Sequence, residues 1–106
     1  MKTSELTGAA LDWAVAKCGF VQGTARSLIA SEKRYSTDWA QGGPIIERED
    51  IAVWPDAEEG GWFASSGGGR GTDYKGTTPL IAAMRCYVAS KLGDEVELPE
   101  ELIPRD

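Results

Sequence analysis

The sequence predicts a small α+β domain in which a small antiparallel sheet packs against an N-terminal and a C-terminal helix. Three observations predict it: apolar residues recur at helical spacing near both ends, two short β-type runs flank a turn-rich segment, and no alternation of strand and helix patterns indicates a parallel sheet. A length of 106 residues is typical of one domain, so we assign residues 1–106 to a single domain.

The first helix is expected near the N-terminus and ends at Gly19. Thr3 or Ser4 supplies a capping hydroxyl, and apolar residues recur at helical spacing from Leu6 onward. Gly8 falls within the first turns, where glycine costs up to about 1 kcal/mol relative to alanine. It therefore indicates either close packing or a later helix start, and the sequence leaves both open.

The segment that follows is irregular. Residues 20–38 have weak periodicity, with a short strand expected at residues 27–30. The Gly-Gly-Pro sequence at residues 42–44 is expected to break the chain before the two isoleucines that come next.

The middle of the chain predicts one hairpin. Residues 51–54 form a strand that Pro55 ends, and residues 62–64 return antiparallel to it across a turn rich in glycine and acidic residues. Residues 65–76 contain many glycines and almost no apolar side chain, so they predict an exposed, mobile loop.

The C-terminal helix carries the clearest signals. Thr77 or Thr78 is the N-cap, Pro79 takes the first helical position, and Gly93 follows the last turn of a helix over residues 80–92. Its buried face is expected to contain Leu80, Ala83, Met84, Tyr87 and Val88.

The charge and the apolar runs exclude some classes of partner. Seventeen acidic and eleven basic residues give a net charge of −6, which opposes general nucleic-acid binding. Arg26, Lys33 and Arg34 form the one basic stretch, which we interpret as solvated surface. No apolar run approaches the roughly 20 residues that cross a bilayer, so no membrane association is expected.

The composition also limits catalysis. The chain has no histidine, which removes the commonest general base and metal ligand. Cys18 and Cys86 occupy apolar helical positions and are interpreted as core thiols of a protein in a reducing cytoplasm, although a disulfide between packed helices stays an alternative. No metal or cofactor is expected, and enzyme activity is left open with a noncatalytic role favoured. A magnesium-dependent nuclease built on Asp38 and Glu47 is a third alternative.

Four residues are the candidate ligand-binding set: Asp38, Trp39, Arg70 and Arg85. Trp39 offers a surface for a flat ring and Asp38 an acceptor for its amine, while Arg70 in the glycine-rich loop and Arg85 on the C-terminal helix offer grips for an anion. Each has a simpler interpretation. Trp39 can be core, the loop can be a linker, and Arg85 can form a salt bridge to the acidic tail.

Three stretches resemble one family. They are TSELTGAALDWAVA at residues 3–16, STDWAQGGPIIERE at residues 36–49 and TPLIAAMRCYVASKLG at residues 78–93. Together they are similar to the NinX-like family of small bacteriophage and prophage proteins, a domain of unknown function. The resemblance implies a phage origin and action in the cytoplasm of a host bacterium.

Two functions from different classes follow. The first is a noncatalytic phage accessory protein that binds a host small molecule, a nucleotide-like signal, as an anti-defence protein would. The alternative is a protein–protein interaction module that inhibits or redirects a host protein through acidic residues: Glu95, Glu97, Glu100 and Glu101. Because a small sheet leaves an open face and edges, a homo-oligomer is also an expected possibility.

Overall fold

The structure is a computed structural model that describes residues 1–19, 34–66 and 73–103. The strand expected at residues 27–30 lies outside these ranges. A short 3₁₀ helix, η1 (Thr3–Glu5), precedes α1 (Gly8–Gly19), so the later helix start is the correct alternative. Gly8 has φ 52°, a left-handed conformation that glycine adopts at little cost. The Thr3 hydroxyl donates to the carbonyl of Gly93 at 2.7 Å instead of capping α1.

The expected chain break at residues 42–44 is wrong, because α3 (Trp39–Arg48) runs through all three residues. The side chain of Asp38 begins this helix by accepting the Ala40 N–H at 2.9 Å. Pro44 lies inside the helix, and the residue before it is a glycine. A residue before proline is disfavoured in the helical region partly through its Cβ, which Gly43 lacks.

Close packing explains the other glycine. Gly42 is buried, and a Cβ at that position would overlap the carbonyl oxygen of Tyr35 and lie 2.6 Å from Leu80 Cδ1. Gly42 therefore allows a close helix contact, and Gly43 allows the proline that follows it to lie inside the helix. Signals that normally end a helix have a tertiary role in this chain.

The predicted hairpin is confirmed, and a third strand extends it. Strands β1 (Ala52–Pro55), β2 (Trp62–Ser65) and β3 (Tyr74–Gly76) form an antiparallel sheet in the order β1-β2-β3. Val53 pairs with Ala64, and Ala64 pairs with Tyr74. The loop expected over residues 65–76 is wrong at both of its ends, because Ser65 belongs to β2 and residues 74–76 form β3. Pairing with β2 imposes an extended conformation that the local sequence does not specify.

The C-terminal helix α4 (Pro79–Leu92) is confirmed with its caps. Thr78 Oγ1 accepts the Ile81 N–H at 3.1 Å, and Gly93 ends the helix with φ 87°. All five residues expected on its inner face are buried, and so are Ala82 and Cys86. The helix is therefore covered on most of its circumference, which explains why it is central to the fold.

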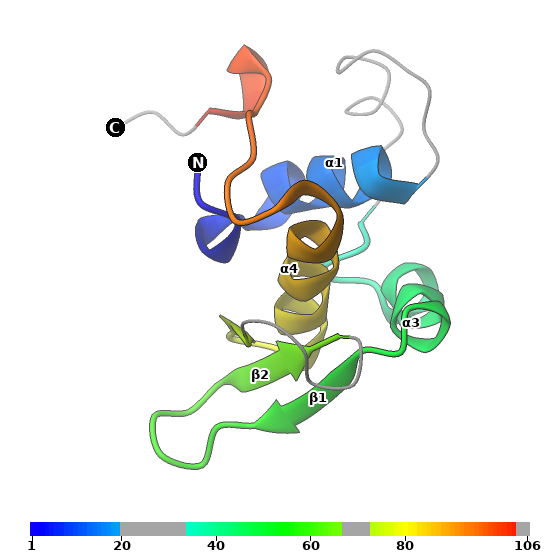
Figure 1. The fold of residues 1–106 in the computed structure, drawn as a ribbon, viewed down its shortest axis with the longest axis vertical. Helices are drawn as coiled ribbons and strands as arrows, with labels where there is room; N and C mark the ends of the chain where they lie inside the picture. The colour runs from blue at the N-terminus through cyan, green and yellow to red at the C-terminus, as the bar shows by residue number, and fades with distance from the viewer. Residues whose placement is uncertain (20–33, 67–72, 104–106) are drawn as a thin grey trace.

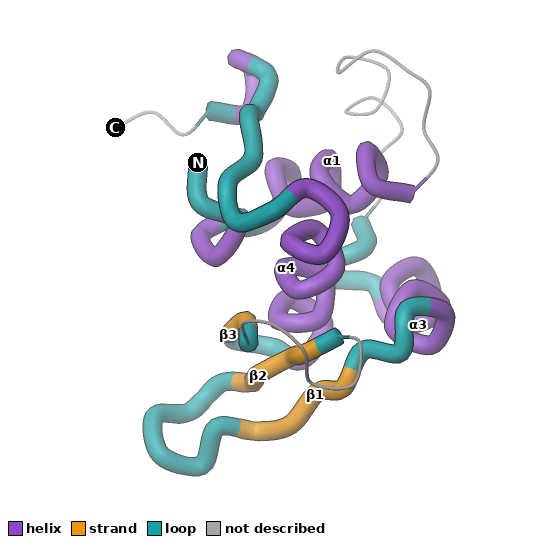
Figure 2. The backbone as a smooth tube through the Cα atoms, viewed as in Figure 1, coloured by secondary structure: helices purple, strands orange, loops and turns teal. Residues whose placement is uncertain are grey.

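The arrangement is the α+β architecture that the sequence predicts. Figure 1 shows α4 in the middle, with α1 crossing it at one end, the sheet at the other and α3 at the side. Figure 2 shows β3 next to β2, at the edge of the sheet. Helix α4 contacts all three strands, α1, α3 and η1. The main core combines Leu6, which follows η1, with residues of α1, α4 and the sheet: Leu11, Ala14, Val15, Ala64, Leu80, Met84, Tyr87 and Val88.

The two ends of the described chain are joined by backbone hydrogen bonds. The Met1 ammonium donates to Val96 O at 3.0 Å, and the Val96 N–H donates to Met1 O at 2.9 Å. An isolated bridge pairs Lys2 with Glu95 beside them. A second 3₁₀ helix, η2 (Glu100–Leu102), follows. The first residues of the chain are thereby fixed against the segment after α4.

The two cysteines are free thiols, so no disulfide joins α1 to α4. Cys86 is buried and Cys18 is half-buried, as their apolar helical positions predict. Burial raises the pKa of Cys18 to about 11 and raises the pKa of Cys86 as well. Both thiols are therefore protonated and unreactive at neutral pH.

Candidate functional site

Arg85 occupies an unusual place for a charged residue. It projects from α4, its Nε donates to Leu6 O at 2.9 Å, and its Nη1 donates to Lys75 O at 2.7 Å. Both acceptors are backbone carbonyls, one in front of α1 and one in β3. The side chain is half-buried, and burial lowers the pKa of Arg85 from its ordinary value. The two hydrogen bonds hold the guanidinium in one orientation between three parts of the fold.

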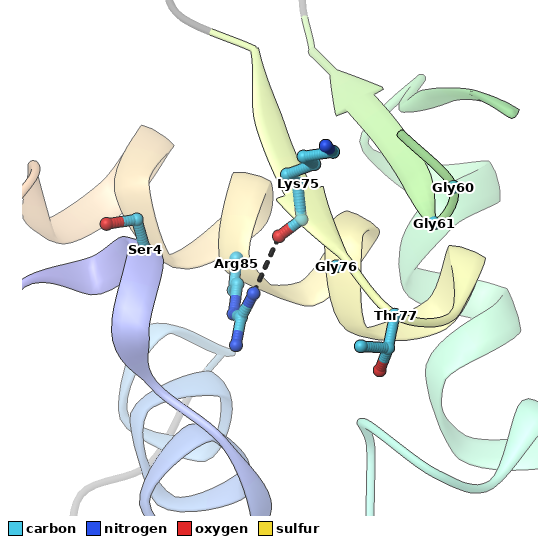
Figure 3. Close-up of a pocket in the computed structure, with 7 residues that line it drawn as sticks. All are labelled: Ser4, Gly60, Gly61, Lys75, Gly76, Thr77 and Arg85. Atoms are coloured by element: carbon cyan, nitrogen blue, oxygen red, sulfur yellow. Dashed lines mark hydrogen bonds between the residues drawn. The ribbon is translucent and has the colours of Figure 1, made fainter. Parts of the chain in front are cut away.

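A cavity of about 500 Å³ opens beside this guanidinium. Figure 3 shows Arg85 between the Ser4 end of η1 and the strand that carries Lys75, with Thr77 pointing into the same region. The lining residues come from η1, the hairpin turn, β3 and α4: Ser4, Gly60, Gly61, Lys75, Gly76, Thr77 and Arg85. A volume in this range is typical of small-molecule sites.

Glycines shape one wall of this cavity. Gly61 has φ 83°, and a Cβ there would lie 2.8 Å from Gly76 O. Gly76 itself is buried, and a Cβ at that position would lie 2.5 Å from the backbone nitrogen of Ala82. Only glycine therefore fits at position 61, just before β2, and at position 76, where the end of β3 packs against α4. Such a wall presents backbone to the cavity in place of side chains.

Arg85 is the unneutralised charge in the lining. Lys75, the other cation, forms ion pairs with Asp56 at 2.7 Å and Glu59 at 3.0 Å, and these contacts raise its pKa. Its side chain points away from Arg85 (Figure 3). Among the described residues, no carboxylate lies within ion-pair distance of Arg85. The salt bridge to the acidic tail is therefore not observed among the described residues.

The structure places the four sequence-predicted residues in different surroundings. Asp38 caps α3 and also accepts the Gln41 Nε2–H at 2.9 Å, so its oxygens already have partners. Trp39 is 54% exposed, so its interpretation as core is wrong. Arg85 lines the cavity, whereas Asp38 and Trp39 do not. Arg70 lies outside the described residues.

Sequence reasoning missed most of the cavity. The sequence predicts Ser4 and Thr77 only as helix caps, and Gly60 and Gly61 only as turn residues. Lys75 and Gly76 were assigned to a loop. The one available signal was the density of glycine on both sides of the hairpin, and that pattern equally predicts a flexible connection.

The described residues contain neither a metal-ligand cluster nor a membrane-spanning helix. Within residues 1–19, 34–66 and 73–103, no cluster of three or more Cys, Asp or Glu side chains is arranged to hold a metal ion. In those same ranges, no helix combines the length and the apolar character that crossing a membrane requires.

A comparison with protein families supports the resemblance seen in the three sequence stretches. A family model described as Bacteriophage P22, NinX matches residues 2–91. A comparison with curated proteins finds no match. The matched range begins before η1, continues through the sheet and ends within α4, so it includes every residue that lines the cavity. Because this range covers nearly the whole sequence, the chain belongs to the bacteriophage P22 NinX family.

Proposed function

We propose that this phage protein is a noncatalytic binder of a small anionic ligand of the nucleotide class, and that Arg85 holds the anionic group. The proposal depends on one observation: a half-buried guanidinium lines an open cavity and has no carboxylate partner among the described residues. Taking a charge partly out of water is unfavourable unless another charge compensates. A bound anion supplies that compensation.

The geometry favours a ligand-binding role for Arg85 in addition to its structural hydrogen bonds. Within the part of the chain that the structure describes, Nε and Nη1 donate to backbone carbonyls, which leaves Nη2 for an external acceptor. Ser4 and Thr77 line the same cavity, and the Thr77 hydroxyl offers a further donor for a phosphate oxygen. In Figure 3 the Ser4 hydroxyl points away from Arg85, so the guanidinium is the main group for an oxyanion.

A noncatalytic role fits the same residues. The chain has no histidine, and both cysteine thiols have pKa values raised by burial, so the common general base and an activated thiol are lacking. In a phage accessory protein, sequestering a signal molecule of the host requires affinity alone. We expect this action in the cytoplasm of the host bacterium.

The test combines native mass spectrometry with titration calorimetry. The full chain, purified from bacterial cells, is examined for a co-purifying small molecule and then titrated with adenosine 5′-monophosphate. Arg85→Met should weaken binding by at least about tenfold, since a charge-assisted hydrogen bond contributes roughly 1.5–3 kcal/mol. Arg34→Met is the matched control, because Arg34 is exposed and its loss changes the net charge equally.

The outcomes separate the site from general charge effects. Equal loss of affinity in both variants, or no measurable binding by the folded wild-type protein, contradicts the proposal. Because Arg85 also joins η1 to β3, thermal unfolding of each variant accompanies the titration. Arg85→Lys retains the charge and should recover part of the affinity if the loss in Arg85→Met is electrostatic.

The predicted contacts at Asp38 and Trp39 are a separate part of the proposal. Trp39 is exposed at the start of α3 and is available to stack on a ring, while Asp38 is occupied as a helix cap. Trp39→Ala should lower nucleotide affinity only if the ligand reaches α3. An unchanged affinity in a folded Trp39→Ala protein restricts the site to the cavity beside Arg85.

The acidic interaction module is the second candidate. Glu95 and Glu97 are exposed on the segment after α4, which the backbone hydrogen bonds of Val96 hold in place. Neighbouring exposed carboxylates on a fixed backbone suit a basic protein surface. Capture of a host protein that disappears in Glu95→Gln/Glu97→Gln and persists in Arg85→Met would favour this candidate.

A further inference from the structure

A second cavity, of about 380 Å³, adjoins the one beside Arg85. The two share Ser4 and Lys75, so these two residues form the boundary between them. The second cavity is lined by the N-terminal segment, β3 and the segment after α4: Lys2, Ser4, Asp73, Tyr74, Lys75, Asp94 and Glu95. An extended molecule that crosses the Ser4 boundary would occupy both.

The two cavities have opposite charge. Arg85 is the unpaired cation of the first, whereas Asp73, Asp94 and Glu95 face a single remaining cation, Lys2, in the second. Lys75 is already neutralised by two carboxylates of the hairpin turn. Within the described residues, no side chain hydrogen-bonds to any of the three carboxylates of the second cavity, so their oxygens are available to external donors.

The wall that carries these carboxylates is held by backbone contacts. The Thr3 N–H donates to Asp94 O at 2.9 Å, and Glu95 forms a β-bridge with Lys2. Tyr74 is anchored in β3 through its pairing with Ala64. Tyr74 and Asp94 line this cavity together, and burial, followed by the charge of Asp94, raises the pKa of Tyr74. An aromatic residue and carboxylates on a fixed backbone therefore line one cavity.

We propose that the ligand is a nucleoside monophosphate whose base carries an exocyclic amino group, with its phosphate at Arg85 and its base at the wall formed by Tyr74, Asp94 and Glu95. Such a molecule has an anionic end and a donor-bearing ring separated by a sugar, which matches the order of charges across Ser4. The amino group donates to a carboxylate, and the ring lies beside the aromatic side chain. This inference rests on the proposed function and specifies the ligand and its direction.

The base is tested with pairs of nucleotides in which an oxo group replaces the exocyclic amino group and the neighbouring ring nitrogen gains a hydrogen. Adenosine monophosphate should bind about tenfold more tightly than inosine monophosphate, because the oxo group presents an acceptor to the carboxylate where the amino group presents a donor. Cytidine and uridine monophosphates form the second pair and should differ in the same direction. Adenosine, which lacks the phosphate, should bind more weakly than adenosine monophosphate by at least about tenfold.

The wall is tested with isosteric variants that retain the backbone. In Asp94→Asn/Glu95→Gln the preference for adenosine monophosphate over inosine monophosphate should fall to near unity. Glu97→Gln is the control, since Glu97 is exposed and lies outside both cavities. In amide NMR spectra, inorganic phosphate should shift the signal of Thr77, and adenosine monophosphate should shift Thr77 and Glu95.

Each result has one meaning. If adenosine and inosine monophosphates bind equally and both lose affinity in Arg85→Met, the orientation is overturned while the anion site stands. If a folded wild-type protein binds none of the nucleotides, both the orientation and the proposed function are overturned. If the preference persists in Asp94→Asn/Glu95→Gln, the base is not recognised by this wall and the inference fails.

Discussion

Two adjacent glycines of α3 should respond differently to the same substitution. Alanine normally stabilises a helix relative to glycine by up to about 1 kcal/mol. At Gly42 the added methyl would overlap the carbonyl oxygen of Tyr35 and lie 2.6 Å from Leu80 Cδ1. A methyl added at Gly43 would meet, apart from its chain neighbours and the backbone of its own helix, only Trp39 Cε3 at 3.9 Å. The packing term therefore opposes the helix term at Gly42 alone.

The size of the effect follows from these contacts. Overpacking a close contact costs about 1–3 kcal/mol, and the upper part of that range applies because a backbone carbonyl cannot rotate away. Subtracting the gain in helix propensity leaves Gly42→Ala less stable than wild type by about 2 kcal/mol. Gly43→Ala should stay within about 1 kcal/mol of wild type, since its propensity gain is offset by the clash of a Cβ with the following proline.

Urea denaturation of the two variants and the wild type measures this difference. The free energy of unfolding should fall by about 2 kcal/mol in Gly42→Ala, and the melting temperature by about 10 °C. Gly43→Ala controls for the change in helix propensity on the same element. If Gly42→Ala proves as stable as Gly43→Ala, the contact of α3 with Tyr35 and Leu80 is not as close as the structure shows.

Three further substitutions test other parts of the fold. Thr78→Ala should lower the free energy of unfolding in urea by about 1 kcal/mol through loss of the α4 cap, whereas Thr78→Ser should retain most of it. Gly76→Ala places a methyl 2.5 Å from Ala82 N and should cost about 2–3 kcal/mol in the same assay; a change below about 0.5 kcal/mol would contradict this packing. Burial raises the pKa of Cys18 from 9.0 to about 11, so the folded state retains the proton more tightly and loses stability as pH rises from about 9 to about 11. Unfolding measured across this range should show a smaller fall in Cys18→Ala, and an identical fall would refute the burial argument.

Several elements were predictable because their signals are local. The cap, first-turn proline and terminal glycine of α4 act within one or two turns of the helix, so residues 78–93 alone specify where this helix begins and ends. The β1-β2 hairpin likewise depends on two short runs and the turn between them. The family resemblance was also contained in the sequence, and the match over residues 2–91 confirms it.

The candidate site was only partly predictable. Arg85 was identified as a ligand-binding candidate from its residue type and its helix, yet the residues around it come from four separate segments. Its two acceptors, Leu6 O and Lys75 O, lie 79 and 10 residues away in the sequence. No local pattern indicates that these carbonyls would hold a guanidinium at the edge of a cavity.

The sequence by itself determined the family, the helix α4 with its caps and the β1-β2 hairpin, and its lack of histidine limited the possible chemistry. Tertiary structure decided whether the remaining glycines break or permit regular structure. Gly42 allows the close approach of Tyr35 and Leu80 to α3, and Gly76 allows the close approach of α4 to β3. The physical reason is that glycine has weak local preferences, so contacts from distant segments determine its conformation.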